Sequence, residues 1–382
     1  MATMTSAKPA RATGAKPQAA AAGRIASIDA LRGFDMLWIS GGDELIHSLH
    51  RAHPSAATAF LSTQFEHVEW AGFHFYDLIF PLFVFVVGLV LPFSLTRRLE
   101  AGGDRRQLYL HAARRLGILL LFGLLYNGLL DFNFHDLRLA GVLQRIAIAY
   151  FFATLLTMNL TIRGQLIATA AILLGYWAIM ALVPVPGFGA GVYTPQGNLA
   201  AYLDQRLLPR PFCCYSFGDN EGLISNIPAI ATCMMGVLAG HWLRSDRSRN
   251  RKAAGLVAAG VASLAVALLW SLKFPIVKNI WSSSFVLYAG GWSLLLLALF
   301  YYVMDVRGYQ RWAFFFVVIG ANSIAVYLAH RFFDFRIVGD VFIHGLFRYM
   351  GVWRPFIRQA AGVAVSWCLF WYLYRRRIFL RV

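Results

Sequence analysis

Long apolar segments alternate with short hydrophilic breaks along almost the whole chain. A membrane-spanning α-helix needs roughly 20 apolar residues. Segments that approach this length lie near residues 28–48, 73–95, 115–131, 139–160, 165–184, 226–243, 254–272, 284–304, 312–330 and 356–374. The pattern therefore predicts an all-α, polytopic integral membrane protein with about ten transmembrane helices.

Arginine and lysine gather in alternate connections between these segments, ending with the basic tail 375–377. The opposite set of connections is longer, more aromatic and less basic, and comprises residues 49–72, 132–138, 185–225, 273–283 and 331–355. Basic connections face the cytoplasm by the positive-inside rule. Both termini are therefore predicted in the cytoplasm and the second set outside. The apolar stretch 337–353 is interpreted as interfacial or re-entrant, because a further span would send the basic tail outside.

The composition supports this class of protein. Hydrophobic residues make up 59% of the chain and charged residues only 14%, which does not fit a water-soluble core. The net charge of +17 comes from residues in the hydrophilic breaks, so we interpret it as a topology signal and expect no nucleic-acid partner. Cysteine is sparse and lacks the paired spacing of metal ligands. Cys213 and Cys214 are expected to serve as small apolar residues, with a redox role as the alternative.

The chain begins with a segment of different composition. Residues 1–26 are alanine-rich and basic and contain no aromatic residue. This composition predicts a disordered cytoplasmic tail, followed by a transmembrane domain over 27–382. The tail contains no apolar core of a signal peptide, so the first span is expected to act as an uncleaved anchor.

The first apolar segment carries an unusual number of charges. Asp29, Arg32 and Asp35 are spaced by three and can pair on one helix face. A neutralising ion pair and a functional role both remain open for them. Asp43 and Glu44 fall at the predicted outer end, after Gly41 and Gly42, which allow the backbone to bend. Asp43 is therefore a candidate site residue.

The stretch 65–81 concentrates ionisable side chains directly before the uncharged segment 82–95. His67, close to carboxylates, has the chemistry to move a proton or to attack a carbonyl group. Pro81 cannot donate a hydrogen bond to the carbonyl of Asp77, so an irregular helix is predicted there. This favours a functional role for Asp77 over a capping role.

Further polar residues fall toward the predicted outer side, and they include Glu69, Trp70, Arg145, Asp219, Glu221 and His330. Arg145 lies about two turns into its helix, where it needs an anion or a buried carboxylate. Trp70 is suited to stacking on a sugar or to anchoring at the interface. No hydrolase elbow, P-loop, HExxH or CxxC pattern is present, so no metal site is predicted. From the residues alone, a proton-coupled transporter of a sugar or amino sugar is the alternative to an enzyme.

Five segments together resemble the heparan-α-glucosaminide N-acetyltransferase family of transmembrane acyltransferases, which includes bacterial glucosamine N-acetyltransferase relatives. The segments are 27–35, 65–85, 141–145, 219–223 and 322–327, and they occur in the family's order over most of the chain. The resemblance implies transfer of the acetyl group of cytoplasmic acetyl-CoA to the amine of a glucosamine-type sugar at the outer side of a bacterial inner membrane. The expected partners are acetyl-CoA, the amino-sugar acceptor and membrane lipid, and a homodimer is left open.

The resemblance also implies roles for individual residues. His67 matches the family's active-site histidine and Asp77 the acid that follows it. The lysosomal branch has an upstream active-site asparagine that is absent here, and Asp43 is the candidate for that role; the tail 1–26 replaces the large luminal region of that branch. The candidates for acetyl-CoA contact are Arg145, Asn322, Arg114 and Arg115, although topology alone explains the last two. The candidates for sugar contact are Glu69, Trp70, Asp219, Glu221 and His330.

Overall fold

The computed structural model describes residues 25–100, 102 and 104–380, except for the side chains of Thr96, Arg97, Leu99 and Glu100. Nearly all of the predicted tail 1–26 lies outside the described residues. The helices are α1 (Ala26–Leu37), α2 (Asp43–Ala52), α3 (Ala56–Gln64), α4 (Phe75–Leu89), α5 (Leu91–Glu100), α6 (Arg105–Tyr126), α7 (Val142–Asn159), α8 (Ile162–Leu182), α9 (Leu199–Leu207), α10 (Asn226–Arg244), α11 (Arg249–Ser271), α12 (Ser283–Tyr301), α13 (Phe314–Gly320), α14 (Ser323–Phe332), α15 (Phe335–Ile343), α16 (Phe347–Met350) and α17 (Arg354–Arg375). Two short strands of two residues each, β1 (Cys214–Tyr215) and β2 (Gly218–Asp219), form an antiparallel hairpin with Cys214 opposite Asp219.

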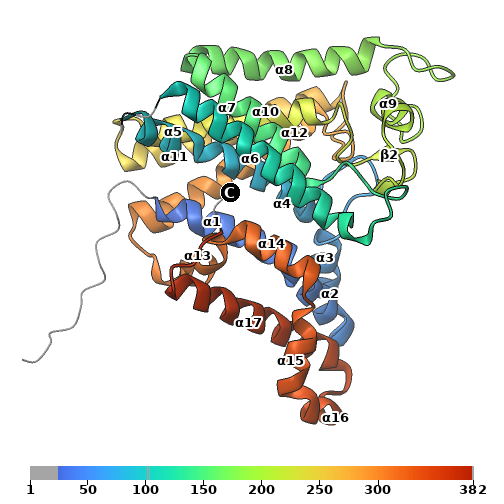
Figure 1. Ribbon diagram of the computed structural model, residues 1–382, viewed down its shortest axis with the longest axis vertical. Helices are drawn as coiled ribbons and strands as arrows, with labels where there is room; N and C mark the ends of the chain where they lie inside the picture. The colour runs from blue at the N-terminus through green and yellow to red at the C-terminus, as the bar shows by residue number, and fades with distance from the viewer. Residues whose placement is uncertain (1–24, 101, 103, 381–382) are drawn as a thin grey trace, which may run out of the picture.

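The fold is an all-α membrane architecture, as predicted. Eight helical segments of the described residues are long and apolar enough to cross a membrane, and nine if α13 and α14, bent by 64°, form one broken span. The predicted segment 28–48 is not among them. Its helix is interrupted at Gly41, where a φ of +100° directs the chain into α2. This left-handed conformation suits glycine. The stretch 337–353 forms the short helices α15 and α16, which project from the start of α17 (Figure 1).

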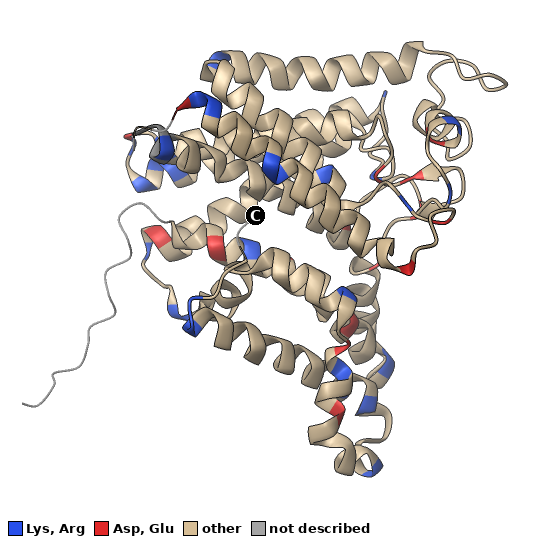
Figure 2. Cartoon of the chain, viewed as in Figure 1, with Lys and Arg blue, Asp and Glu red and all other residues tan. Residues whose placement is uncertain are grey.

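The charges of α1 pair only in part. Arg32 Nη1 lies 3.5 Å from Asp29 Oδ1, which is the predicted intrahelical ion pair. Asp35 does not complete the predicted triad: its carboxylate is fully buried, and neither oxygen has a hydrogen-bond partner among the described residues. Elsewhere most Lys and Arg residues lie near helix ends, leaving long uncharged stretches between them (Figure 2).

Helix α4 lies in the core, and all residues from Asp77 to Leu89 are buried. It packs against α7, α10 and α12, whereas α1 packs against α13 in the neighbouring group of helices (Figure 1). The approach of α10 to α4 is close because Gly236 has no side chain: a Cβ there would lie 1.9 Å from the carbonyl oxygen of Phe85. Small residues permit this backbone contact between membrane helices.

Replacing Gly236 with leucine is expected to destabilise the protein by more than about 2 kcal/mol, because the helix backbones must separate. The measurement is the fraction of monodisperse protein in detergent after graded heating. Gly117→Leu is the matched control, since no described atom lies within 4 Å of a Cβ built at Gly117 on α6. Equal thermal losses in the two variants would contradict the assigned contact.

A second small core supports the loops at one end of the bundle, to the right in Figure 1, and we call this the loop end. Its buried residues include Tyr176, Leu199, Phe274, Val277 and Ile280. The Tyr176 hydroxyl donates to the Ile280 carbonyl oxygen at 2.6 Å. The Gly72 amide donates to the Ile276 carbonyl oxygen at 2.9 Å, and Ala71 bridges to Val277. These contacts hold the loop 272–282 against the stretch before α4.

Candidate active site

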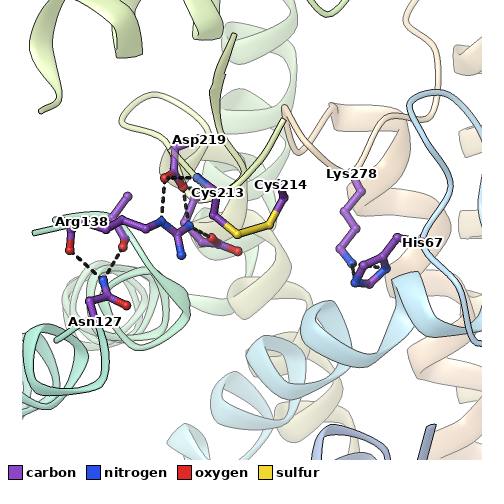
Figure 3. Close-up of a disulfide and its surroundings, with 9 residues drawn as sticks. His67, Asn127, Arg138, Cys213, Cys214, Asp219 and Lys278 are labelled. Carbon is purple, nitrogen blue, oxygen red and sulfur yellow. Dashed lines mark hydrogen bonds and ion pairs between the residues drawn. A yellow bond between two sulfur atoms is a disulfide. The ribbon is translucent and has the colours of Figure 1, made fainter. Parts of the chain in front are cut away.

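A cavity of about 380 Å³ opens at the loop end, between α4, α6, α7 and the loops that follow α9 and α11. We call it the main cavity. Its polar lining includes His67, Tyr76, Asn127, Arg138, Gln144, Asn220, Glu221 and Lys278, together with the sulfur-bearing Cys213 and Cys214. Part of this lining is drawn in Figure 3.

His67 and Asp77 form a hydrogen-bonded pair at the N-terminus of α4. His67 Nδ1 lies 2.8 Å from Asp77 Oδ1, and the side chains are 49% and 2% exposed. Asp77 Oδ2 accepts from the backbone amides of His74 at 3.1 Å and Val68 at 3.4 Å. A carboxylate that accepts from Nδ1 leaves Nε2 as the basic nitrogen of the imidazole. The pair thus presents a nitrogen suited to accepting a proton.

Asp77 also caps its helix, so the side chain that bonds to His67 has the capping role as well. It occupies the third position of α4, and its bond to the His74 amide satisfies a free donor of the first turn. The predicted irregularity at Asp77 is wrong, because α4 continues through Pro81. Pro81 lies close to the helix start, where only one backbone bond, to the Asp77 carbonyl, is lost.

Lys278 contacts both members of the His67–Asp77 pair, and the sequence analysis did not identify it. Its Nζ lies 2.9 Å from His67 Nδ1, 3.3 Å from His67 Nε2 and 3.2 Å from Asp77 Oδ1. Burial lowers the pKa of the Lys278 ammonium group, while Asp77 acts in the opposite direction. The signal that could have found Lys278 is its position: a lysine on the predicted outer side is not explained by the positive-inside rule.

Tyr76 links the pair to Asp43. Its ring stacks on His67 with centroids 4.8 Å apart, and its hydroxyl donates to Asp43 Oδ2 at 2.9 Å. Asp43 itself lines a second cavity of about 560 Å³, between α2, α14 and α17. The structure therefore brings Asp43 to His67 only through the tyrosine.

Arg138 binds both predicted carboxylates of the 219–223 segment. Its Nε donates to Asp219 Oδ2 at 2.7 Å, and its Nη2 contacts Asp219 and Glu221 (Figure 3). Burial opposes the charge, but hydrogen bonds and charges of Asp219 and Glu221 raise the pKa of Arg138 above its usual value. Asp219 also accepts from the Cys213 amide at 3.1 Å. Asp219 thus fixes the loop, while Glu221 and Arg138 line the main cavity.

Cys213 and Cys214 form a disulfide with each other, drawn beside Lys278 and Arg138 in Figure 3. Their interpretation as small apolar thiols is therefore wrong. Cys233 is buried and Cys368 exposed, and both are free thiols.

Arg145 and Asn322 are engaged in contacts within the fold. Arg145 is buried against the Trp281 ring at 4.4 Å and bonds to Ser225 and Asn226. These partners are an aromatic face and neutral oxygens, and Nη1 of Arg145 has no hydrogen-bond partner among the described residues, so an anion at this atom stays a prediction. Asn322 Nδ2 donates to the Ile378 carbonyl oxygen at 3.0 Å, and its Oδ1 accepts from the Leu380 amide at 3.0 Å. Asn322 therefore holds the chain after α17 against the break between α13 and α14.

The other predicted sugar-contact residues do not line the main cavity. Trp70 Nε1 donates to the Tyr193 carbonyl oxygen at 2.8 Å and fixes two loops together. Glu69 is exposed on the same loop. His330 lines the second cavity, with Nδ1 2.8 Å from the Val326 carbonyl oxygen.

Arg115 lines a third cavity, of about 180 Å³, at the opposite end of α6 and α7. Arg98, His111 and Tyr150 line it as well, and the Arg115 guanidinium lies 4.2 Å from the Tyr150 ring centroid. The buried Nε of Arg115 has no hydrogen-bond partner within the described part of the chain. Arg114, the residue before Arg115 on α6, is exposed and does not belong to the cavity lining.

Comparison with known proteins yields two similar curated sequences, and no family model matches the chain. Human heparan-alpha-glucosaminide N-acetyltransferase is 27% identical over 325 residues, which cover 71% of this chain and 49% of that protein. The mouse protein of the same name is 27% identical over 322 residues, covering 70% and 49%. The chain thus spans about half the length of the curated relatives it matches. The resemblance predicted from the five segments is confirmed.

Proposed function

As a distant relative of the heparan-alpha-glucosaminide N-acetyltransferases, this chain is, we propose, a membrane N-acetyltransferase that moves the acetyl group of cytoplasmic acetyl-CoA to the amine of a glucosamine-type sugar at the outer side. The observation that carries the proposal is the His67–Asp77 pair, joined by Lys278, in a cavity at the loop end. A base oriented by a carboxylate is what acyl transfer to an amine requires.

In direct transfer, the bound ammonium group loses one proton to water, and the neutral amine nitrogen then attacks the thioester carbonyl carbon. The new C–N bond forms, the C–S bond breaks, and a second proton passes from the nitrogen to His67 Nε2. The positive charge of the imidazolium is stabilised by Asp77, which lies 2.8 Å from Nδ1. Lys278 is placed to stabilise the negative charge that develops on the carbonyl oxygen and then on the thiolate.

A two-step route uses the same nitrogen. His67 Nε2 attacks the thioester, the C–S bond breaks, and an acetyl-imidazole forms with release of the CoA thiolate. The amine nitrogen then attacks the acetyl carbon, the bond between that carbon and Nε2 breaks, and the amine proton passes to the freed imidazole. Both routes require Asp77 on Nδ1 and exclusion of water from the cavity. An acetylated His67 trapped without acceptor distinguishes the second route from the first.

Glu221 and Arg138 are suited to the sugar. Both line the main cavity and are held in place by Asp219. A carboxylate attracts an ammonium group, and the pair together offers acceptors and donors to hydroxyl groups. We assign this charged side of the cavity to the amino-sugar acceptor.

The third cavity is suited to the phosphates of acetyl-CoA. It presents Arg98, Arg115 and His111, and none of its described lining residues is a carboxylate. Guanidinium groups bind phosphate oxygens. Helices α6 and α7 run between the third cavity and the main cavity, and Arg115 and Gly123 on α6 are about 12 Å apart along the axis at the α-helical rise. A slim thiol arm can cover this distance between helices.

Two features support the proposed orientation. The arginine-rich connections fit a cytoplasmic face by the positive-inside rule. The Cys213–Cys214 disulfide lies in the loop set on the opposite side, and disulfides persist in oxidising compartments. Acetyl-CoA would then enter at the third cavity, and the sugar at the main cavity.

Replacing Arg115 with glutamine is expected to raise the KM for acetyl-CoA roughly tenfold, because a charge-assisted contact to phosphate is lost. The KM for the sugar and the rate with a short acetyl thioester lacking phosphates should change little. The measurement is steady-state kinetics with both donors. Arg114→Gln is the matched control, since Arg114 is exposed outside the cavity. A tenfold rise in both variants would assign the effect to surface charge instead.

The function is tested with purified protein, labelled acetyl-CoA and a panel of amino sugars. The proposal predicts labelled N-acetyl sugar with the wild type and a rate lower by about 10²-fold or more with His67→Ala. Absence of transfer to every amino sugar would overturn it. Proton-driven sugar uptake into liposomes without CoA would identify a transporter instead.

A further inference from the structure

Gln144 is an unsatisfied polar side chain in the wall of the main cavity. It lies in the first turn of α7 and is only 6% exposed. Its Oε1 and Nε2 are both buried, and neither has a hydrogen-bond partner among the described residues. Asn220, in the same cavity wall, has a buried Oδ1 that is likewise unpartnered within the described chain. Buried polar groups normally find partners, so these atoms indicate a ligand.

A slot made by two glycines holds the Gln144 amide in place. A Cβ at Gly123 on α6 would lie 2.3 Å from Gln144 Oε1 and 2.4 Å from its Cδ. A Cβ at Gly141 would lie 2.6 Å from the same oxygen. The side chain therefore fits only because both positions lack a Cβ. The slot is a built feature of the α6–α7 contact rather than a loose surface position.

The chemistry of the two side chains selects the ligand. A carboxamide offers a C=O acceptor and an N–H donor side by side. A secondary amide, –CO–NH–, presents the complementary pair. The positively charged amine and hydroxyls of an amino sugar suit Glu221 and Arg138, which line the same cavity. Before transfer, the compound in the reaction that carries secondary amides is the acetyl donor, in its thiol arm.

The position of Gln144 agrees with the donor arm. Val142 and Leu143, its neighbours in the first turn of α7, border both the main cavity and a small apolar cavity that also contacts Met36, Phe83 and Ile146. An arm that reaches the main cavity along α7 from the third cavity would pass this apolar lining first. The amide of Gln144 would then lie beside the point where the arm enters the main cavity.

We propose that Gln144, with Asn220, binds the secondary amide nearest the thioester in the thiol arm of the donor and so positions the acetyl carbon against His67. This inference rests on the proposed function. Gln144 is a positioning and specificity residue here, because it touches the arm and not the reacting atoms. The N-acetyl group of the product is the other source of a secondary amide, and the test separates the two.

The test compares two short donors, S-acetyl-N-acetylcysteamine and its analogue in which an ester replaces the amide. Wild type is expected to prefer the amide donor by roughly tenfold in kcat/KM, the effect of one buried hydrogen bond. Gln144→Leu should bring this ratio close to one. Gly123→Ala should do the same, because the new methyl group displaces the amide from its slot. Gln310→Leu, outside all the cavities described, is the control and keeps the ratio.

Two kinetic results would overturn the proposal. The first is an equal loss of kcat/KM with the amide and the ester donor in Gln144→Leu, which would mean that the enzyme does not bind the amide of the arm through Gln144. The second is an unchanged ratio of kcat/KM between the two donors in Gln144→Leu together with weaker inhibition by the N-acetyl sugar. This result would assign the slot to the product.

A binding measurement separates this inference from the proposed function, because it needs no turnover. Pantetheine, which carries the arm without the nucleotide, is expected to raise the melting temperature of the wild type in detergent and not that of Gln144→Leu. Such a difference without acetyl transfer would retain the slot and reject the enzyme function. Equal protection of both proteins, or of neither, would reject the slot even if transfer occurs.

Discussion

Replacing His67 with alanine is expected to lower kcat for acetyl transfer by about 10²–10⁴-fold, the usual contribution of a positioned general base. The loss has a structural cause: the imidazole is the group that Asp77 orients toward the main cavity, with 2.8 Å between Nδ1 and Oδ1. The KM for acetyl-CoA should change little, because the phosphate site that we propose is the third cavity, whose lining does not include His67. The measurement is steady-state transfer of labelled acetyl groups to glucosamine.

His74→Ala is the matched control for this variant. His74 lies seven residues further on, and its ring nitrogen Nδ1 is 3.1 Å from the Glu66 carbonyl oxygen, outside the cavity lining. Its kcat is expected to stay within a few-fold of the wild type. Comparable losses in the two variants would assign the effect to the fold of the 65–75 stretch and contradict the role given to His67.

Replacing Asp77 with asparagine is expected to lower kcat by about 10²–10⁴-fold, as for His67→Ala. The asparagine amide can accept from the His74 backbone, but it cannot both orient the His67 tautomer and stabilise its positive charge. The neighbouring Lys278 ammonium, 3.2 Å from Asp77 Oδ1, also loses its counter-charge. We therefore expect a loss of rate together with a loss of about 1 kcal/mol of stability from the weakened cap.

The Asp77→Asn experiment needs two readouts, transfer rate and thermal unfolding. Asp136→Asn is the control, because Asp136 is an exposed carboxylate paired with a histidine outside the main cavity. A stability loss in Asp77→Asn with an unchanged rate would show that Asp77 acts only as a cap. The rate should fall even at temperatures where the variant is fully folded.

The part of the site that is local in sequence could be predicted. His67 and Asp77 are ten residues apart at the entrance of an uncharged segment, so proximity followed from the chain itself. Lys278 is 211 residues from His67 and reaches it through the Ala71–Val277 bridge and the small core under the loops. No periodicity or spacing in the sequence encodes that loop contact.

Buried polar residues were harder to interpret. Arg145 was expected to need an anion or a carboxylate because a buried charge is costly in a membrane, and both Arg145 and Asn322 were candidates for acetyl-CoA contact. The structure pairs Nε and Nη2 of Arg145 with neutral oxygens beside an aromatic ring but gives Nη1 no hydrogen-bond partner among the described residues, whereas Asn322 bonds to backbone groups near the C-terminus. Sequence shows that such a residue needs a partner, but it does not show whether the partner is the protein or a ligand. Gln144 is the opposite case, left unpaired by the fold.

The span count illustrates a limit of hydropathy. Segment length alone makes 28–48 a transmembrane helix, but the left-handed Gly41 divides it. The sequence carried this signal in Gly41-Gly42, and a length rule does not weigh it. Conversely, the two-glycine slot around Gln144 depends on α6 meeting α7, which no single helix pattern reveals.

The central claim is that an acetyl group donated at the arginine-rich face reaches an amine at the His67 face. It is tested most directly in proteoliposomes of known protein orientation, with labelled acetyl-CoA on one side and glucosamine on the other. We predict labelled N-acetylglucosamine only when acetyl-CoA meets the arginine-rich face and the sugar meets the loop end, and a rate lower by about 10²-fold or more with His67→Ala. Transfer that requires both compounds on the same side, or that persists in His67→Ala at the wild-type rate, would contradict the account.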